Sequence, residues 1–162
     1  MISSARLGIF DALADGPLNA NEVAARCQAS QQGVWYLLRA TAWAGYLKQT
    51  GNRFALADVA QKFMVRTSPR STRGFVEWLS HASTFFQQFD DCVRLGHGID
   101  FHRDLTDVEL WGLYQRAMLE GARFSARTLA QRVPVKTGAT RLLDVAGSHG
   151  LLGAAICRPI HP

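Results

Sequence analysis

Apolar residues recur every three or four positions in the first part of the chain, which is the spacing of one helix face. Leu7, Phe10 and Leu13 follow this pattern over residues 4–14, and the turn-prone sequence DGP then ends the predicted helix. Asn19, with Glu22 three residues later, has the pattern of a capping box. We therefore expect a second, short helix that extends to about residue 27.

A third helix and a hairpin are predicted next. Ser30 can cap the helix, whose apolar positions are Val34, Leu37, Leu38 and Ala42, with Trp35 and Trp43 adding bulk. In the sequence GYLKQTGNRFAL, two short extended runs flank Gly51 and Asn52, a turn-prone pair that is typical of a β-hairpin. Three helices followed by a hairpin have the order of a winged helix-turn-helix.

The middle of the chain is also predicted to be helical. The sequence ADVAQKFM predicts a short helix, and residues 71–95 carry aromatic side chains at roughly helical spacing. The sequence GHGIDFHRDLT is predicted to be a loop. A long helix is then expected over 107–132, capped by Thr106 or Asp107, with more large apolar residues than one face can hide. We expect a partner chain to cover some of them.

The last part of the chain reads LLDVAGSHGLLGAAI, residues 142–156. Residues 142–146 are mainly apolar, as expected of a parallel strand covered on both faces. Gly147 and Gly150 allow a tight turn and the close approach of a ligand to the backbone. The next helix would offer free N–H groups to a carboxylate. Plain packing of a helix on a strand is the alternative interpretation, and a kinase-like phosphate loop is excluded because no Gly-Lys-Ser/Thr follows.

Composition narrows the class of protein. The chain has 162 residues, of which 48% are hydrophobic and 19% charged, enough for one domain or for a small domain plus part of another. The sequence MISSARLGIF lacks the features of a signal peptide, and no apolar run approaches the length of a membrane span. Three cysteines, far apart and odd in number, predict neither a disulfide framework nor a zinc site. We therefore expect a cytoplasmic protein without membrane association.

The charged residues favour packing over nucleic-acid binding. The net charge is +5, but the basic residues are scattered, and the third predicted helix carries a single arginine, Arg39. Phosphate contacts from lysine and arginine supply most non-specific DNA affinity, so we expect this helix to pack or dimerise instead. Lys48 and Arg53 on the hairpin leave a winged-helix DNA-binding transcriptional regulator as the alternative. His97 and His102 lie near acidic residues in a hydrated loop, and we predict no metal site.

The order of these parts resembles the N-terminal portion of the S-adenosylmethionine-dependent O-methyltransferases of the small-molecule type, which have a winged-helix dimerisation domain. LGIFDALADGPLNANEVAARC resembles the first two helices of that family, and LLRATAWAGYLKQTGNRFAL its third helix and wing. YQRAMLEGARFSA is similar to its long helix, and LLDVAGSHG to its first methyltransferase motif. The family usually has glycine where this chain has Ala146 and Ser148.

The resemblance implies a mainly α fold: a winged helix-turn-helix-like dimerisation domain with a small β-hairpin, then the start, one β-α unit, of a Rossmann-like α/β methyltransferase domain. The corresponding ranges are a dimerisation domain over 1–100, a long helix and linker that line the acceptor pocket over 101–138, and the truncated start of the cofactor domain over 139–162. The resemblance also implies contacts with the methionine end of S-adenosylmethionine from Asp144, Gly147, Ser148, His149 and Gly150.

The same resemblance implies an acceptor pocket lined by Tyr114, Met118 and Phe124. The methyl acceptor that it implies is a small molecule with a hydroxyl group, aromatic or of natural-product type. The catalytic residue is expected beyond Pro162, so the chain alone is expected to be inactive. The expected partner is a second copy, or a further methyltransferase segment that completes the domain. A non-catalytic dimerisation scaffold is a further alternative.

Overall fold

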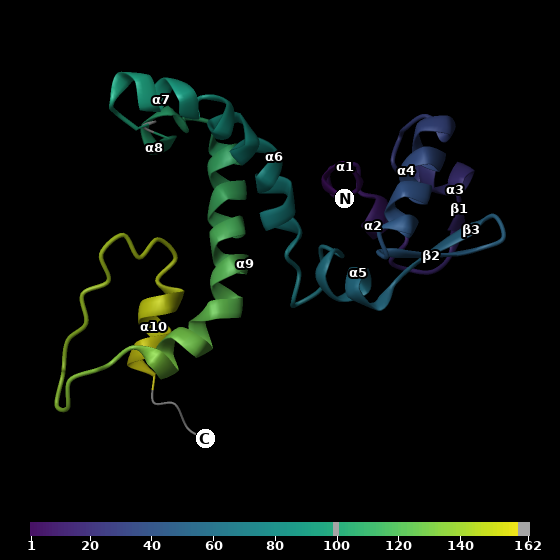
Figure 1. The fold of residues 1–162 in the computed structure, drawn as a ribbon. Helices are drawn as coiled ribbons and strands as arrows, with labels where there is room; N and C mark the ends of the chain where they lie inside the picture. Colours follow the sequence, from purple (N-terminus) through teal and green to yellow (C-terminus); the bar gives the residue numbers. More distant parts are fainter. Residues whose placement is uncertain (99–100, 159–162) are drawn as a thin grey trace. The chain divides into compact units, whose positions relative to one another are not determined.

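The computed structural model describes residues 1–98 and 101–158. The chain divides into two compact units, Met1–Ile99 and Asp100–Pro162. The elements of both units are labelled in Figure 1.

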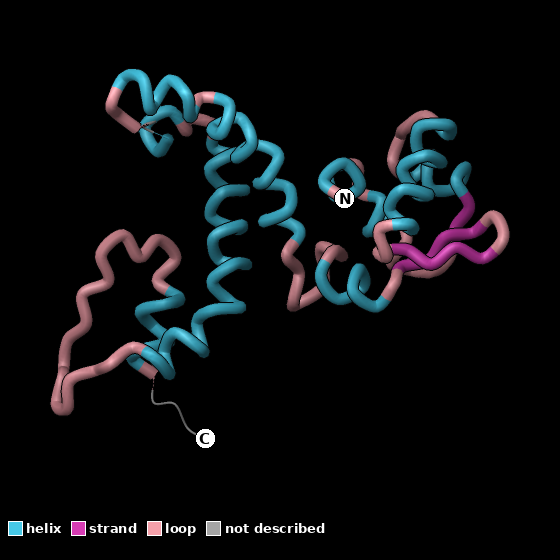
Figure 2. The backbone as a smooth tube through the Cα atoms, in the orientation of Figure 1, coloured by secondary structure: helices cyan, strands magenta, loops and turns pink. Residues whose placement is uncertain are grey.

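The first unit is a helical assembly with one small sheet. Its helices are α1 (Ile2–Arg6), α2 (Ile9–Ala12), α3 (Ala20–Arg26), α4 (Gln31–Trp43), α5 (Asp58–Phe63), α6 (Arg73–Gln87) and α7 (Phe89–Leu95). Its strands are β1 (Leu18–Asn19), β2 (Leu47–Thr50) and β3 (Arg53–Leu56), magenta in Figure 2. They form an antiparallel sheet of order β1-β3-β2. The predicted hairpin is therefore present, and β1 is an additional strand that the apolar pattern did not predict.

The first predicted helix is divided in two. Gly8 adopts a left-handed conformation with φ of 78° between α1 and α2, a conformation that glycine adopts without steric cost. This break changes the direction of the chain, so Phe10 and Leu13 are buried whereas Leu7 is 45% exposed. The prediction of one continuous apolar face was therefore wrong at Leu7.

The second predicted helix begins with the capping box expected from the sequence. The Asn19 side chain accepts hydrogen bonds from the backbone N–H groups of Asn21 and Glu22 at 2.9 and 3.0 Å, and the Asn19 N–H donates to the Glu22 carboxylate at 2.7 Å. These contacts satisfy amide groups that the first turn of a helix leaves without a partner. The sequence prediction is confirmed at the level of individual hydrogen bonds.

The core of the first unit lies between α1–α4 and the sheet. Phe10, Leu38 and Phe54, from a helix, another helix and a strand, are each 1% exposed or less. Within this core the hydroxyl groups of Ser4 and Thr41 are hydrogen bonded at 2.8 Å, which satisfies two polar groups that burial removes from water.

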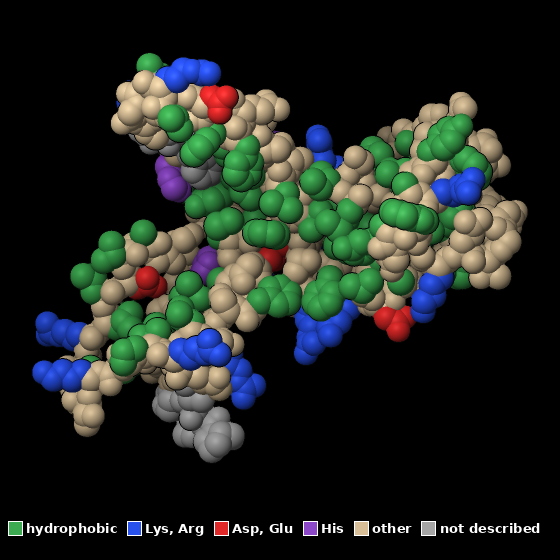
Figure 3. All heavy atoms as spheres, in the orientation of Figure 1, with side chains coloured by type: hydrophobic (Ala, Val, Ile, Leu, Met, Phe, Trp, Pro, Cys, Tyr) green, Lys and Arg blue, Asp and Glu red, His purple; other side chains and the backbone are tan. Residues whose placement is uncertain are grey.

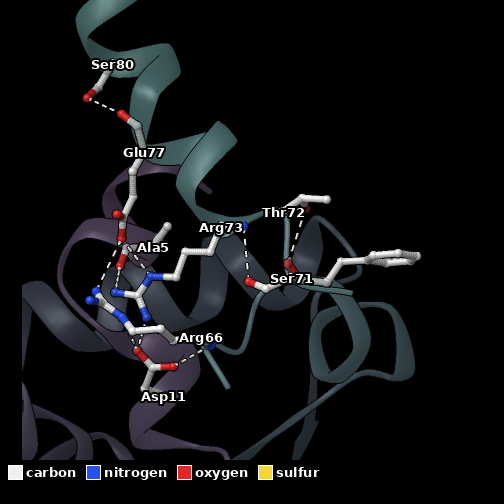
Figure 4. Close-up of polar contacts among 9 residues, drawn as sticks. Ala5, Asp11, Arg66, Ser71, Thr72, Arg73, Glu77 and Ser80 are labelled. Atoms are coloured by element: carbon white, nitrogen blue, oxygen red, sulfur yellow. Dashed lines mark hydrogen bonds and ion pairs between the residues drawn. The ribbon is translucent and has the colours of Figure 1, made fainter. Parts of the chain in front are cut away.

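A buried arginine joins α6 to the N-terminal helices (Figure 4). Arg73 is 4% exposed, and its guanidinium donates to the Asp11 carboxylate, to the Glu77 carboxylate at 2.6 Å and to the Ala5 carbonyl oxygen at 2.6 Å. Arg66 adds longer ion pairs to the same two carboxylates, at 3.9 and 3.8 Å. The planar guanidinium can bind several acceptors at once, which explains why arginine occupies this position.

The second unit consists of α8 (Phe101–Asp104), α9 (Val108–Arg132) and α10 (Leu151–Cys157), with a long loop, pink in Figure 2, between α9 and α10. The long helix was predicted correctly, and the Asp107 carboxylate caps it by accepting from the Leu110 N–H at 2.8 Å. Helix α10 packs on α9. Helix α8 lies in a segment that was predicted to be a loop, and this prediction was wrong for four residues.

The predicted strand at 142–146 is absent from the described part of the chain, which corrects the expected β-α unit. The turn and the helix α10 that should follow the strand are both present. Leu143 and Val145, predicted to be buried on a doubly covered strand, are 87% and 78% exposed. A parallel strand needs a hydrogen-bonded neighbour, and the described residues place none beside this segment.

Candidate functional site

The candidate site in the second unit is the turn that leads into α10. Asp144 places its carboxylate against the backbone of Gly147 and of Gly153 in α10. A Cβ atom on Gly147 would lie 2.5 Å from the Asp144 Cγ, and one on Gly153 would lie 2.5 Å from the Asp144 Oδ2. A side chain at either position would therefore force the Asp144 carboxylate to move. Gly147 was singled out from the sequence, whereas Gly153 was missed because the spacing of a Gly-x-x-Gly turn does not include it.

Three residues of the turn have a left-handed backbone. The φ angles are 59° at Ala146, 49° at Ser148 and 70° at Gly150. Glycine adopts this conformation freely, whereas a residue with a Cβ atom is strained in it. Ala146 and Ser148 are the two positions at which the resemblance noted above has glycine. At Gly150 nothing lies within 4 Å of a would-be Cβ, so the backbone there is open to a ligand.

Side chains of the turn make two further contacts. The Leu151 N–H donates to Nδ1 of His149 at 3.1 Å, so the neutral His149 ring carries its proton on Nε2. The Ser148 hydroxyl donates to the Gln115 side-chain oxygen at 2.8 Å. The first contact caps α10, and the second joins the turn to α9. Gln115 was not identified from the sequence, because nothing local marks a contact between residues 33 apart.

The residues predicted to line an acceptor pocket are on α9. Tyr114 and Met118 are half-buried and four residues apart, so they share one face of the helix. Phe124 is 58% exposed and lies about 120° further round the helix from Met118, so the structure does not bring it onto that face. The Tyr114 hydroxyl is hydrogen bonded to His102 Nε2 at 3.2 Å, and the two rings are 5.6 Å apart.

Trp111 completes an aromatic cluster around this pair. Its ring lies 5.4 Å from the ring of Tyr114 and 6.0 Å from that of His102. Sequence reasoning assigned His102 to a hydrated loop, whereas the short helix α8 carries it to α9. Among the residues that the structure describes, no group of three or more His, Cys, Asp or Glu side chains could hold a metal ion.

The first unit exposes an aromatic face on α4. Trp35, Tyr36 and Trp43 are 39%, 58% and 93% exposed, and the Arg39 guanidinium lies over the Trp35 ring at 4.8 Å from its centroid. Beside this face is an apolar groove of about 440 Å³, lined by Leu7, Ala29, Ser30, Gly33, Val34, Tyr36, Leu37 and Ala40. Hydrophobic side chains reach the surface of both units, as Figure 3 shows. From the sequence, helix α4 was expected to pack or dimerise.

Other apolar side chains are exposed on α6, α7 and α9. Phe86 and Phe89 are 79% and 62% exposed, and Val108 at the start of α9 is 84% exposed. Across residues 1–98 and 101–158, no helix is both long enough and apolar enough to cross a membrane.

Comparison of the sequence with family models finds a match for the first part of the chain. Residues 1–66 match the model of the O-methyltransferase dimerisation domain. This range contains α1 to α5 and the sheet. No curated protein sequence matches the chain at a significant level.

Several solved structures with a similar fold are methyltransferases. An O-methyltransferase family protein from Burkholderia thailandensis is 20% identical, with a TM-score of 0.80 over 96% of this chain and 47% of its own. Human N-acetylserotonin methyltransferase, solved in complex with SAM, is 19% identical, with a TM-score of 0.75 over 96% of this chain and 50% of its own.

A third structure is the N,N-8-amino-8-demethyl-D-riboflavin dimethyltransferase from Streptomyces davawensis. It is 23% identical, with a TM-score of 0.77 over 95% of this chain and 49% of its own. The chain thus spans about half the length of the structures that it matches. At these identities the likeness shows a shared fold.

Proposed function

From the match of residues 1–66 to the model of the O-methyltransferase dimerisation domain, we propose that the chain is the N-terminal part of an S-adenosylmethionine-dependent O-methyltransferase. Its acceptor is a small molecule with a hydroxyl group, aromatic or of natural-product type. The observation that carries the proposal is the fold match at a TM-score of 0.80, which extends over 96% of the chain and so includes α9 and the turn as well as the matched domain.

The turn has the features of a site for the methionine end of the cofactor. Small residues and the open space at Gly150 allow a ligand to approach the backbone. Asp144, Gly147, Ser148, His149 and Gly150 would border the cofactor. S-adenosylmethionine, when bound, supplies an electrophilic methyl group on its sulfonium. The protein residues have the task of holding that group close to the acceptor oxygen and in line with it.

The acceptor pocket is proposed to lie along α9. Tyr114 and Met118 share a face of this helix and offer an aromatic and a flexible apolar surface, with Phe124 nearby in sequence. Deprotonation of the acceptor hydroxyl needs a base. We place this base in the part of the structural neighbours that the chain does not span, and expect the 162-residue chain alone to be inactive.

The first unit is proposed to form a homodimer through α4. The family model that covers this helix is that of a dimerisation domain. Exposed tryptophan and tyrosine side chains are typical of the centres of protein interfaces, and the apolar groove beside them offers a complementary surface to a second copy. The winged-helix topology and the cytoplasmic location expected from the sequence form part of this proposal. The aromatic character of α4 supports dimerisation over DNA binding.

Substitution of glycine in the turn tests the cofactor assignment. We expect the protein isolated from its source to bind S-adenosylmethionine in calorimetric titration, and Gly147→Ala to weaken binding because its Cβ would displace the Asp144 carboxylate. Gly112→Ala on α9 is the matched control, since its Cβ would lie 3.5 Å from an Arg116 nitrogen, an ordinary contact. Absence of binding by the unsubstituted protein, or equal binding by both variants, would contradict the assignment.

A further inference from the structure

We infer that Gln115 is a positioning residue that holds the cofactor turn against the acceptor-lining helix; this inference rests on the proposed function. Gln115 lies on α9 and accepts a hydrogen bond from the Ser148 hydroxyl at 2.8 Å. Neither the family match, which ends at residue 66, nor the sequence pattern assigns a role to Gln115.

The Ser148 end of the turn needs such an anchor. Ser148 is exposed and has φ of 49°, a conformation that is strained for a residue with a side chain. Strain of this kind persists where surrounding contacts enforce it. Gln115 is half-buried, and it is held on a helix of 25 residues, so it offers a well-ordered acceptor.

The other contacts of the turn are local. The Gly150 N–H donates to the Gly147 carbonyl oxygen at 2.8 Å, and His149 accepts from Leu151. These bonds shape the turn and cap α10, but each joins residues at most three apart in the sequence. The bond from Ser148 to Gln115 instead spans 33 residues and fixes the turn to a different element.

The position of Gln115 on α9 links the two proposed binding regions. It directly follows Tyr114 and precedes Met118 by three residues, less than one helical turn. The hydrogen bond therefore joins the turn that would border the methyl donor to the helix segment that would line the acceptor pocket. Methyl transfer depends on the alignment of these two reactants, so loss of the bond should loosen the turn and weaken cofactor binding.

Hydrogen exchange of the 162-residue chain tests whether Gln115 holds the turn. Gln115→Leu keeps the size of the side chain but removes the acceptor, and we expect the amides of residues 147–151 to exchange about fivefold faster. Gln115→Glu retains an acceptor oxygen and should restore slow exchange. Gln131→Leu, at an exposed position near the other end of α9, is the matched control and should leave exchange unchanged. Equal exchange in the Gln115→Leu and Gln131→Leu variants would overturn the inference.

Cofactor affinity tests the functional part of the inference. In the protein isolated from its source, Gln115→Leu is expected to raise the dissociation constant for S-adenosylmethionine about fivefold. Ser148→Ala removes the other partner, so Gln115→Leu should have no added effect in that background. Additive effects, or an unchanged constant in the single variants, would overturn the role in binding. Failure of the unsubstituted protein to bind the cofactor would instead refute the proposed function, while the exchange experiment would still decide whether Gln115 holds the turn.

Discussion

Arg73 shows how a single buried charge can join distant parts of the chain. Its partners Asp11 and Ala5 are 62 and 68 residues away in sequence, and Glu77 is one helical turn along α6. Removal of one partner from a buried ionic network is strongly destabilising, because the remaining charges lose their compensation. The arginine is therefore expected to contribute to stability well beyond an ordinary surface residue.

The Arg73→Ala variant should unfold more easily in urea. We expect a loss of about 3 kcal/mol in the free energy of unfolding, at the lower end of the range for buried pairs because Asp11 is itself 37% exposed. Arg70→Ala is the control: Arg70 is exposed, and its change should stay within about 0.5 kcal/mol. A similar loss of unfolding free energy in the two variants would show that the Arg73 network makes no specific contribution to stability.

The left-handed conformation of Ala146 leads to the prediction of a substitution that stabilises the protein. Its φ of 59° costs about 1–2 kcal/mol, whereas the extra chain entropy of glycine costs about 0.5–1 kcal/mol. Ala146→Gly should therefore stabilise the turn by about 0.5–1 kcal/mol, measured as slower amide exchange at Gly150 and Leu151. Faster exchange in this variant would show that Ala146 is not strained.

The ion pair between Lys48 and Asp58 leads to a prediction about the pKa of Asp58. The Lys48 ammonium donates to the Asp58 carboxylate at 2.9 Å, and this hydrogen bond and the positive charge lower the pKa of Asp58 below its ordinary value of 3.8. A lowered pKa means that the stabilising contribution is present above pH 3.8 and is lost as the pH falls through the folded-state pKa. Both side chains are exposed, so salt should weaken the effect.

Carboxyl-carbon NMR can measure this shift. Lys48→Met should return the pKa of Asp58 toward 3.8, and high salt should do the same in the unsubstituted chain. A pKa that is unchanged by either treatment would contradict the assigned cause.

At the scale of elements, local signals were predicted well. The capping box at Asn19, the hairpin around Gly51 and the long helix that ends at Arg132 all depend on residues that are close in sequence. The segment 142–146 was predicted wrongly, because an apolar run becomes a strand only beside another strand. The break at Gly8 was missed, because a glycine inside a helical apolar pattern does not by itself show whether the helix stops.

The capping box gives a prediction at this scale. Asn19→Ala removes the acceptor for two N–H groups at the start of α3 and should cost about 1 kcal/mol in the free energy of unfolding. Asn21→Ala is the control, since that exposed residue contributes its backbone N–H rather than its side chain to the cap. If the two variants were equally stable, the cap would have no energetic role.

At the scale of the whole molecule, the exposed face of α4 carries the proposed assembly. Trp43 is 93% exposed, and a tryptophan at the centre of an interface commonly contributes 2 kcal/mol or more to binding. Trp43→Ser should therefore weaken the dimer by about thirtyfold in sedimentation velocity over a concentration series. Val59→Ser, at an exposed apolar position on α5, should leave assembly unchanged. A chain that stays monomeric at all concentrations would refute the proposed dimer.

The sequence by itself determined the features that depend on neighbouring residues. Helical periodicity, caps and turn residues predicted most elements, and the glycine turn with its small residues marked the candidate site. Tertiary structure alone decided which distant residues meet: Ser148 with Gln115, His102 with Tyr114, and Arg73 with Asp11. Local patterns reflect backbone geometry over a few residues. Contacts across 12, 33 or 62 positions depend instead on how whole elements pack, which no short pattern contains.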